Sequence, residues 1–107
     1  MSKDITVENV IEKLQSRFQP EAAKDINEVY QFCLEDADDF YVTIADQTCT
    51  PTVGEHDDPS IILTMDSETF IGVVTGEIDG MGAFLRGDLK AQGNIMLATK
   101  LSKLFRR

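Results

Sequence analysis

The first apolar stripe of the chain has the spacing of a helix. Its members recur every three or four residues and are Val7, Val10, Ile11, Leu14 and Phe18. This period predicts an amphipathic helix with Thr6 as a candidate N-cap and Pro20 beyond its end. Because proline suits the first position of a helix, we also expect a short second turn over residues 20–24.

The middle of the chain alternates between apolar and polar residues, which is the period of a strand. The alternation covers residues 26–34 and 40–45, and the acidic residues 35–39 between them have the composition of a hairpin loop. Residues 47–53 form a weaker stretch, whose Pro51 favours a position at the edge of a sheet. The pattern therefore predicts three strands in succession.

The second half of the chain begins with a compact apolar strand at residues 60–65. Asp66 or Ser67 can cap a helix that would end at Gly76, and Asp79 can cap a shorter helix after it. These helices separate the fourth predicted strand from the fifth.

The last predicted strand and helix complete an α+β pattern. Residues 88–93 place Leu89 and Ala91 on one face of a strand, and Asn94 can cap a final helix. The apolar positions of that helix are Leu97, Leu101, Leu104 and Phe105. We therefore expect residues 1–107 to form a single domain, with a five-stranded, largely antiparallel sheet covered on one face by helices.

Charge is unevenly distributed along the chain, whose formal net charge is −9. Residues 21–79 contain fifteen acidic side chains and a single basic one, Lys24, whereas residues 86–107 contain six basic side chains and one acid, Asp88. An acidic body repels nucleic acid phosphates, so we expect no nucleic-acid partner. The acidic part is typical of a well-solvated surface.

The sequence lacks an evident catalytic constellation. Its single histidine, His56, stands among the acids of residues 55–58, which could hold a divalent cation weakly. Adjacent residues on one loop rarely converge on one ion, so a solvated loop is the better interpretation and no metal is expected. Without a nucleophile beside a base, or a phosphate-binding glycine motif, we expect a binding protein that is not an enzyme and needs no cofactor.

The two cysteines are predicted to stay free thiols. Cys33 and Cys49 fall on the first and third predicted strands, and two strand spacings exceed the reach of a disulfide. Their small number and the absence of a recognisable export signal or membrane span favour a cytoplasmic location.

The C-terminal half resembles a known family. Residues 60–105 read SIILTMDSETFIGVVTGEIDGMGAFLRGDLKAQGNIMLATKLSKLF. This run resembles the sterol carrier protein type 2 domain, the nonspecific lipid-transfer family, in which a segment closing on G(D/K)L is followed by another glycine and a helix of the form LxxKLxxLF. The matching residues are Asp66, Phe70, Gly76, Ala83, Phe84, Gly87, Leu89, Gly93, Lys100, Leu101, Leu104 and Phe105. With no terminal peroxisomal tripeptide and no neighbouring enzyme domain in this sequence, it resembles a stand-alone, prokaryotic-type member.

The resemblance implies an apolar tunnel between the sheet and the C-terminal helices. Its candidate wall is Phe32, Phe70, Val73, Val74, Met81, Phe84, Leu97, Leu101 and Leu104. At any single position a solid core is the better interpretation, and only the set taken together favours a cavity. The implied ligands are fatty acids, fatty acyl-CoA, phospholipids or sterol-like molecules, which the protein would bind and carry. The alternative is an interaction module that holds lipid for a partner enzyme without transferring it.

The basic end of the chain supports a further hypothesis about partners. Lys100, Lys103, Arg106 and Arg107 lie in the last turns of the final predicted helix, where cations complement the helix dipole. They are also candidates for transient contact with an anionic membrane. We expect a monomer or a weak homodimer.

Overall fold

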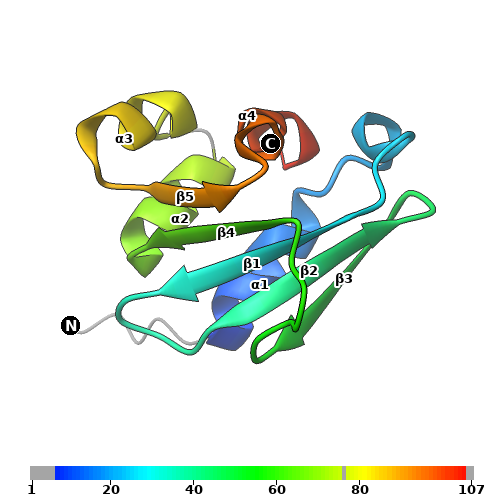
Figure 1. Cartoon of the computed structure of the whole chain (residues 1–107), viewed down its shortest axis with the longest axis horizontal. Coiled ribbons are helices and arrows are strands. Elements are labelled where there is room, and N and C mark those ends of the chain that lie inside the picture. Colours follow the sequence, from blue (N-terminus) through cyan, green and yellow to red (C-terminus); the bar gives the residue numbers. More distant parts are fainter. Residues whose placement is uncertain (1–6, 76, 106–107) are drawn as a thin grey trace.

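The computed structural model describes residues 7–75 and 77–105. The elements are α1 (Val7–Ser16), the 3₁₀ helix η1 (Pro20–Ala23), β1 (Glu28–Leu34), β2 (Phe40–Ala45), β3 (Thr48–Val53), β4 (Ile61–Met65), α2 (Ser67–Thr75), α3 (Gly80–Arg86), β5 (Lys90–Gly93) and α4 (Ile95–Leu104). The five strands form one open sheet in the order β3-β2-β1-β4-β5 (Figure 1). Only the β1–β4 pair is parallel within the described sheet, so the predicted α+β fold with a largely antiparallel sheet is confirmed.

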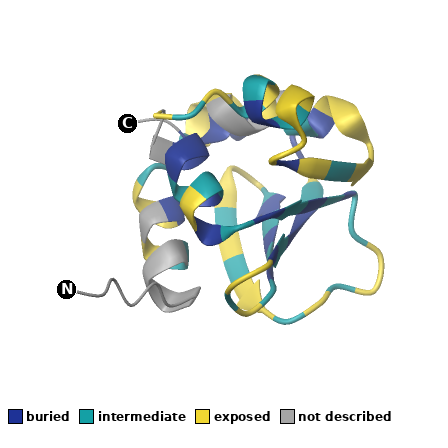
Figure 2. Cartoon of the chain, turned by 90° about the vertical axis from the view of Figure 1, so that its left-hand side faces the viewer, coloured by how far each residue is buried: buried dark blue, intermediate teal, exposed yellow. Residues whose placement is uncertain are grey.

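Strand alternation selects the face of the sheet that becomes the core. Tyr30 and Phe32 of β1 lie opposite Ile61 and Leu63 of β4, and all four side chains are fully buried. The helices lie over this face, and buried positions concentrate between them and the sheet (Figure 2). The period of two in the sequence therefore corresponds to one apolar buried face, as a sheet covered on one side requires.

Aromatic rings occupy the centre of this core. The ring of Phe32 stacks on Phe40 with centroids 5.1 Å apart and meets the edge of Phe70 from α2 at 5.0 Å. Phe40 also meets Phe70 edge-on at 5.7 Å. These offset and edge-to-face arrangements are the ones that aromatic quadrupoles favour. They join two strands to α2.

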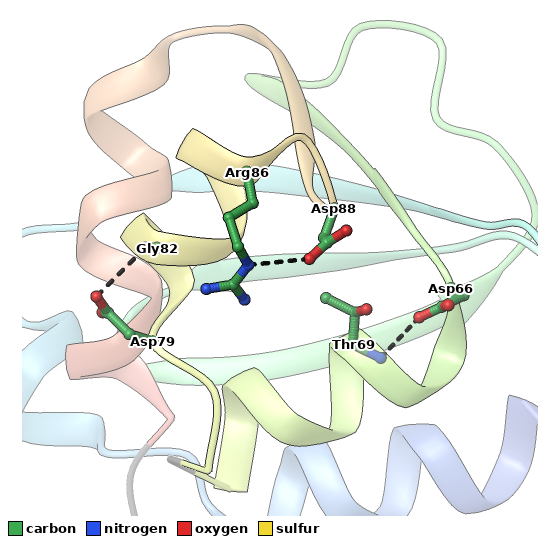
Figure 3. Close-up of polar contacts among 6 residues, drawn as sticks. All are labelled: Asp66, Thr69, Asp79, Gly82, Arg86 and Asp88. Atoms are coloured by element: carbon green, nitrogen blue, oxygen red, sulfur yellow. Dashed lines mark hydrogen bonds and ion pairs between the residues drawn. The ribbon is translucent and has the colours of Figure 1, made fainter.

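Three helices begin directly after a residue that was predicted to be the N-cap. A side-chain oxygen of Asp66 accepts a hydrogen bond from the Thr69 amide at 2.8 Å, and the Asp79 carboxylate accepts one from the Gly82 amide at 3.3 Å (Figure 3). Asn94 likewise accepts from the amide of Met96 at 3.2 Å. Each acceptor satisfies an amide that the first turn of a helix leaves without a partner. The predicted cap at Thr6 and the helix end at Gly76 lie outside the described residues.

Two phenylalanines that the apolar spacing assigns to helices lie just beyond them. α1 ends at Ser16 and α4 at Leu104, and Phe18 and Phe105 instead form an isolated antiparallel bridge with ring centroids 5.8 Å apart. The amide of Gln19 donates to the carbonyl of Leu104 at 2.7 Å. The segments that follow α1 and α4 therefore pair with each other directly beyond the two helix ends.

Glycine is required on both sides of β5. Gly87 ends α3 with φ +87, and Gly93 ends β5 with φ +107, backbone conformations that L side chains rarely adopt. A Cβ on Gly93 would also lie 2.8 Å from the carbonyl oxygen of Ser60 on the neighbouring segment. These two positions allow the chain to leave α3, pass along β4 and turn into α4.

The cysteine positions agree with the prediction. Cys33 lies in β1 and Cys49 in β3, with β2 between them, and both are free. Burial raises the pKa of the Cys49 thiol to about 12. The Cys33 pKa is also raised, first by burial and then by the neighbouring charges of Asp39 and Glu55.

Candidate functional site

The residues predicted to line a tunnel come from the sheet and from α2, α3 and α4. Buried among them are Phe32, Phe70, Val73, Val74, Leu97 and Leu104. Phe84 is half-buried, and Met81 is 46% exposed. The side chain of Leu101 lies outside the described part of the structure. The structure thus brings most of the set together between sheet and helices, while the tunnel itself stays a prediction.

α2 is held in place at its first turn by the β1–β2 loop. One carboxylate oxygen of Asp36 accepts from the Ser67 amide at 2.8 Å, and the other accepts from the Ser67 hydroxyl at 2.7 Å. Ser67 is fully buried, so this pair connects the acidic loop to the interior. The hydrogen bonds from the Ser67 hydroxyl and amide lower the pKa of Asp36. The sequence predicts the loop but gives no sign of its contact with α2.

α4 is fixed to the sheet by a buried tyrosine. The hydroxyl of Tyr30 donates to the carbonyl oxygen of Leu97 at 3.0 Å, and Tyr30 is 0% exposed. Burial, with a smaller effect from the charge of Glu28, raises the Tyr30 pKa and keeps the hydroxyl a neutral donor. This anchor was not predicted. The only sequence signal is a tyrosine at a core position of β1, where a buried hydroxyl must find a partner.

Large apolar side chains are exposed on α3 and on the first turn of α4. The exposed fractions are 46% for Met81, 77% for Leu85, 41% for Ile95 and 69% for Met96. α3 and α4 contact one another, so these residues come from two adjacent helices. Arg86, in the last turn of α3, pairs with Asp88 at 3.2 Å (Figure 3).

A partly open pocket lies between η1 and the second half of α4. Its volume is ≈ 390 Å³, and it is lined by Glu21, Ala22, Lys24, Asp25, Ile26, Lys100 and Lys103. Two of the four residues predicted to contact a membrane therefore border a concave site, and the other two, Arg106 and Arg107, lie outside the described residues. The sequence does not predict that Lys24 lines this pocket. The one sign is that Lys24 is the single basic side chain within the acidic residues 21–79.

The histidine loop is organised by protein contacts. The backbone amide of His56 donates to the side-chain oxygen of Gln31 at 2.7 Å, and the amide of Asp58 donates to Nδ1 of His56 at 3.0 Å. The imidazole meets the ring of Tyr41 edge-on at 5.0 Å. Across the described residues, no group of three or more histidine, cysteine, aspartate or glutamate side chains is placed to hold a metal ion.

The described helices differ from membrane-spanning ones. None of them has both the length and the apolar character needed to cross a membrane.

Comparison with known proteins identifies relatives over almost the whole chain. Residues 8–106 match the family described as the SCP-2 sterol transfer family. The hydroxysteroid dehydrogenase-like protein 2 of Rattus norvegicus is 31% identical over 101 residues, which cover 92% of this chain and 19% of that protein. Where 101 residues of the chain are matched, they span about a fifth to a quarter of the length of the curated relatives.

Solved structures share the fold at lower identity. The sec-alkylsulfatase Pisa1 from Pseudomonas sp. superposes with a TM-score of 0.85 at 17% identity, covering 96% of this chain and 17% of that chain. Palmitated SCP2L2 from Aedes aegypti superposes with a TM-score of 0.75 at 20% identity, covering 94% and 95% of the two chains. These similarities concern the arrangement of strands and helices.

Proposed function

The chain belongs to the SCP-2 sterol transfer family, and from that premise we propose that it binds a lipid in an apolar site between the sheet and its helices and carries it. The observation behind the proposal is the layer of buried apolar side chains that β1, α2 and α4 direct toward one another. Lipid handling in general follows from the family. What we propose beyond this is the identity of the ligand and its transfer by the protein.

An acyl chain is the best-supported part of the ligand. The SCP2L2 protein of Aedes aegypti was solved with palmitate, and an acyl chain needs only apolar surroundings. Burial contributes about 0.8 kcal/mol per methylene, so about twelve methylenes give on the order of 10 kcal/mol before association costs. That is enough for micromolar binding. Fatty acids, acyl-CoA, phospholipids and sterol-like molecules all offer such a surface.

Membrane contact belongs to the proposed carrier role. Lys100 and Lys103 are exposed on α4, in a chain whose net charge is −9. Each basic residue close to an anionic surface contributes about 1 kcal/mol, and salt screens the attraction. With Arg106 and Arg107 the contact would be weak and reversible, which suits a carrier.

No catalytic role is proposed for this chain. The buried polar groups of the candidate site are committed to structural hydrogen bonds: the Tyr30 hydroxyl donates to the Leu97 carbonyl, and the Ser67 hydroxyl donates to the Asp36 carboxylate beside the first turn of α2. A binding role requires no reactive groups and therefore accounts for this site.

An assembly module is the second candidate function. Its support is the size of the relatives, because this chain corresponds to 19% of the rat dehydrogenase-like protein and 17% of the alkylsulfatase chain. A domain of this kind can hold lipid for an enzyme to which it is joined or bound. The exposed apolar residues on α3 and α4 offer a surface for such a contact.

Two measurements test the proposal. Native mass spectrometry after gentle purification is expected to show a co-purified lipid, whereas an empty and stably dimeric protein would favour the assembly role. Transfer of a neutral fluorescent acyl lipid from anionic vesicles is then measured after Lys100, Lys103, Arg106 and Arg107 are changed to glutamine together.

The carrier proposal expects slower transfer by this variant with unchanged affinity for the neutral lipid, and a similar slowing of the parent protein in added salt. To control for a change in overall charge, the double variant Arg86→Gln, Lys90→Gln is compared with the double variant Lys100→Gln, Lys103→Gln, since each removes two positive charges. If neither the substitutions nor added salt changes the rate of transfer, the proposal that α4 docks on the membrane is wrong.

A further inference from the structure

Two of the exposed apolar side chains on α3 and α4 are methionines, which have a chemistry that leucine and isoleucine lack. Met81 is 46% exposed and Met96 is 69% exposed, and they share this surface with Leu85 and Ile95. We propose that Met81 and Met96 are sites of reversible oxidation by hydrogen peroxide, and that their oxidation makes this surface polar while the core stays folded. The inference does not depend on which lipid the protein binds.

Access from solvent distinguishes these two methionines from a third. Met65 of β4 is 1% exposed and belongs to the core cluster, so a peroxide in solution reaches its sulfur only when the structure opens. Met81 and Met96 require no opening, because water already reaches both side chains. The same chain therefore carries two methionines that peroxide can attack in the folded state and one that the fold protects.

The reaction is a two-electron oxidation of the thioether. The sulfur attacks one oxygen of hydrogen peroxide, so that a sulfur–oxygen bond forms, the oxygen–oxygen bond breaks and the second oxygen leaves as water. Sulfur is oxidised and the peroxide is reduced, and the product is methionine sulfoxide, a polar side chain. A methionine sulfoxide reductase reverses the change with electrons from two thiols, which become a disulfide as the oxygen leaves as water.

Both methionines lie where a polar side chain can be accommodated. Met81 is the second residue of α3 and Met96 the second residue of α4, in the first turns that Asp79 and Asn94 cap. Among the described hydrophobic residues that form the core or pack against it, neither methionine is found. A sulfoxide oxygen at the end of either side chain leaves the backbone bonds to the two caps in place. Oxidation should therefore alter the exposed surface and spare the fold.

The two cysteines can be kept out of the reaction. A thiol reacts with peroxide as its thiolate. Burial raises the pKa of Cys49 to about 12, and burial with the charges of Asp39 and Glu55 raises the pKa of Cys33. Treatment at about pH 5 suppresses both thiolates further, whereas a thioether has no proton to lose. Oxidation under these conditions therefore reports on methionine.

A double digest tests the proposal one methionine at a time. Cleavage by trypsin and a glutamate-specific protease places Met65 in residues 56–68, Met81 in residues 78–86 and Met96 in residues 91–100. Mass spectrometry of peroxide-treated protein is expected to show Met81 and Met96 oxidised at least about tenfold faster than Met65. The oxidised protein should elute earlier in hydrophobic interaction chromatography with an unchanged urea midpoint, and methionine sulfoxide reductase should restore its elution.

The matched control is the double variant Met81→Leu, Met96→Leu, which keeps apolar side chains of similar volume without a thioether. Its elution should not respond to peroxide, whereas Met81→Gln, Met96→Gln should elute early before any treatment. The proposal is overturned if Met65 is oxidised as fast as the exposed pair, or if oxidation lowers the urea midpoint. It is equally overturned if the parent elutes unchanged after oxidation, or if peroxide shifts the leucine variant as far as the parent.

Discussion

Phe32 in the sheet and Leu85 on α3 are both large apolar residues, yet the first is 0% exposed and the second 77%. Phe32 lies where β1, β2 and α2 meet, and three rings contact one another there. Leu85 lies on a seven-residue helix whose only fully buried side chain is Ala83. The two regions are therefore held differently. Large rings pack on one another in the first, whereas in the second only Ala83 and the half-buried Phe84 join the core and caps satisfy both helix ends.

This difference defines what each region can do. The packed region gives the fold its stability, because apolar area removed from water is the main favourable term. The α3 region, which we define as α3 with the first turn of α4, keeps apolar area in water. Substitutions can test whether the two regions contribute to stability as differently as the exposure of their side chains indicates.

The largest effect is expected from a pair of substitutions, one in each region. Phe32→Ala should lower the free energy of unfolding by about 3–5 kcal/mol, because it leaves a cavity among stacked rings. Leu85→Ala should change it by less than about 0.5 kcal/mol. Urea denaturation followed by circular dichroism measures both. Equal losses would show that Leu85 is packed in solution and that the separation is wrong.

The junction between the two regions should be the next most sensitive position. Gly93→Ala combines a φ of +107 with a Cβ 2.8 Å from the Ser60 carbonyl oxygen, so we expect a loss of about 1–3 kcal/mol in stability. Gly54→Ala is the control, since its φ is +122 but no atom lies within 4 Å of the added Cβ. A loss no larger than that of the control would mean that β4 and β5 can move apart without cost.

Removal of the α3 cap should affect the exposed region alone. Asp79→Ala deletes the acceptor for the Gly82 amide, and loss of an N-cap costs about 1 kcal/mol. Hydrogen exchange of the α3 amides should accelerate, while that of β1 and β4 stays unchanged. Faster exchange throughout the sheet would contradict the view that α3 is held locally by its caps.

The smallest effect concerns the acidic link to α2. The pKa of Asp36 is lowered in the folded protein, so its contribution is present above the ordinary aspartate value of 3.8 and is lost as the pH falls through the folded pKa. Stability should therefore decline below about pH 4, and the decline should be shallower in Asp36→Asn. Urea midpoints at pH 7 and pH 3 measure the difference, with Asp38→Asn as the control from the same loop. Identical acid sensitivity in all three proteins would contradict the role of the Ser67 contact.

Local signals in the sequence predict local structure well. The alternation around Phe32 identifies the core face of β1, and Asp66, Asp79 and Asn94 mark helix starts that the structure confirms. These features depend on residues close together in the chain, where spacing and side-chain chemistry decide the outcome. The exposure of Leu85 is different, because it depends on which element faces α3.

Contacts between distant segments could not be predicted in the same way. The parallel pairing of β1 with β4, the anchor from Tyr30 to Leu97 and the approach of Lys24 to Lys100 each require the complete topology. An isolated lysine or a tyrosine in a strand is compatible with many neighbours. Only the order of strands and the course of η1 decide which neighbour it receives.

The bridge between Phe18 and Phe105 joins segments from near the two ends of the described chain, and this has a consequence for the order of folding. Closing so long a loop is entropically unfavourable until the intervening strands have condensed, so the bridge should form late. The amide of Gln19 donates to the carbonyl of Leu104 across this junction, so its protection reports whether the whole molecule is folded. Its exchange with solvent deuterium would require opening of the terminal pairing, and its protection measures how firmly the first and last segments are coupled.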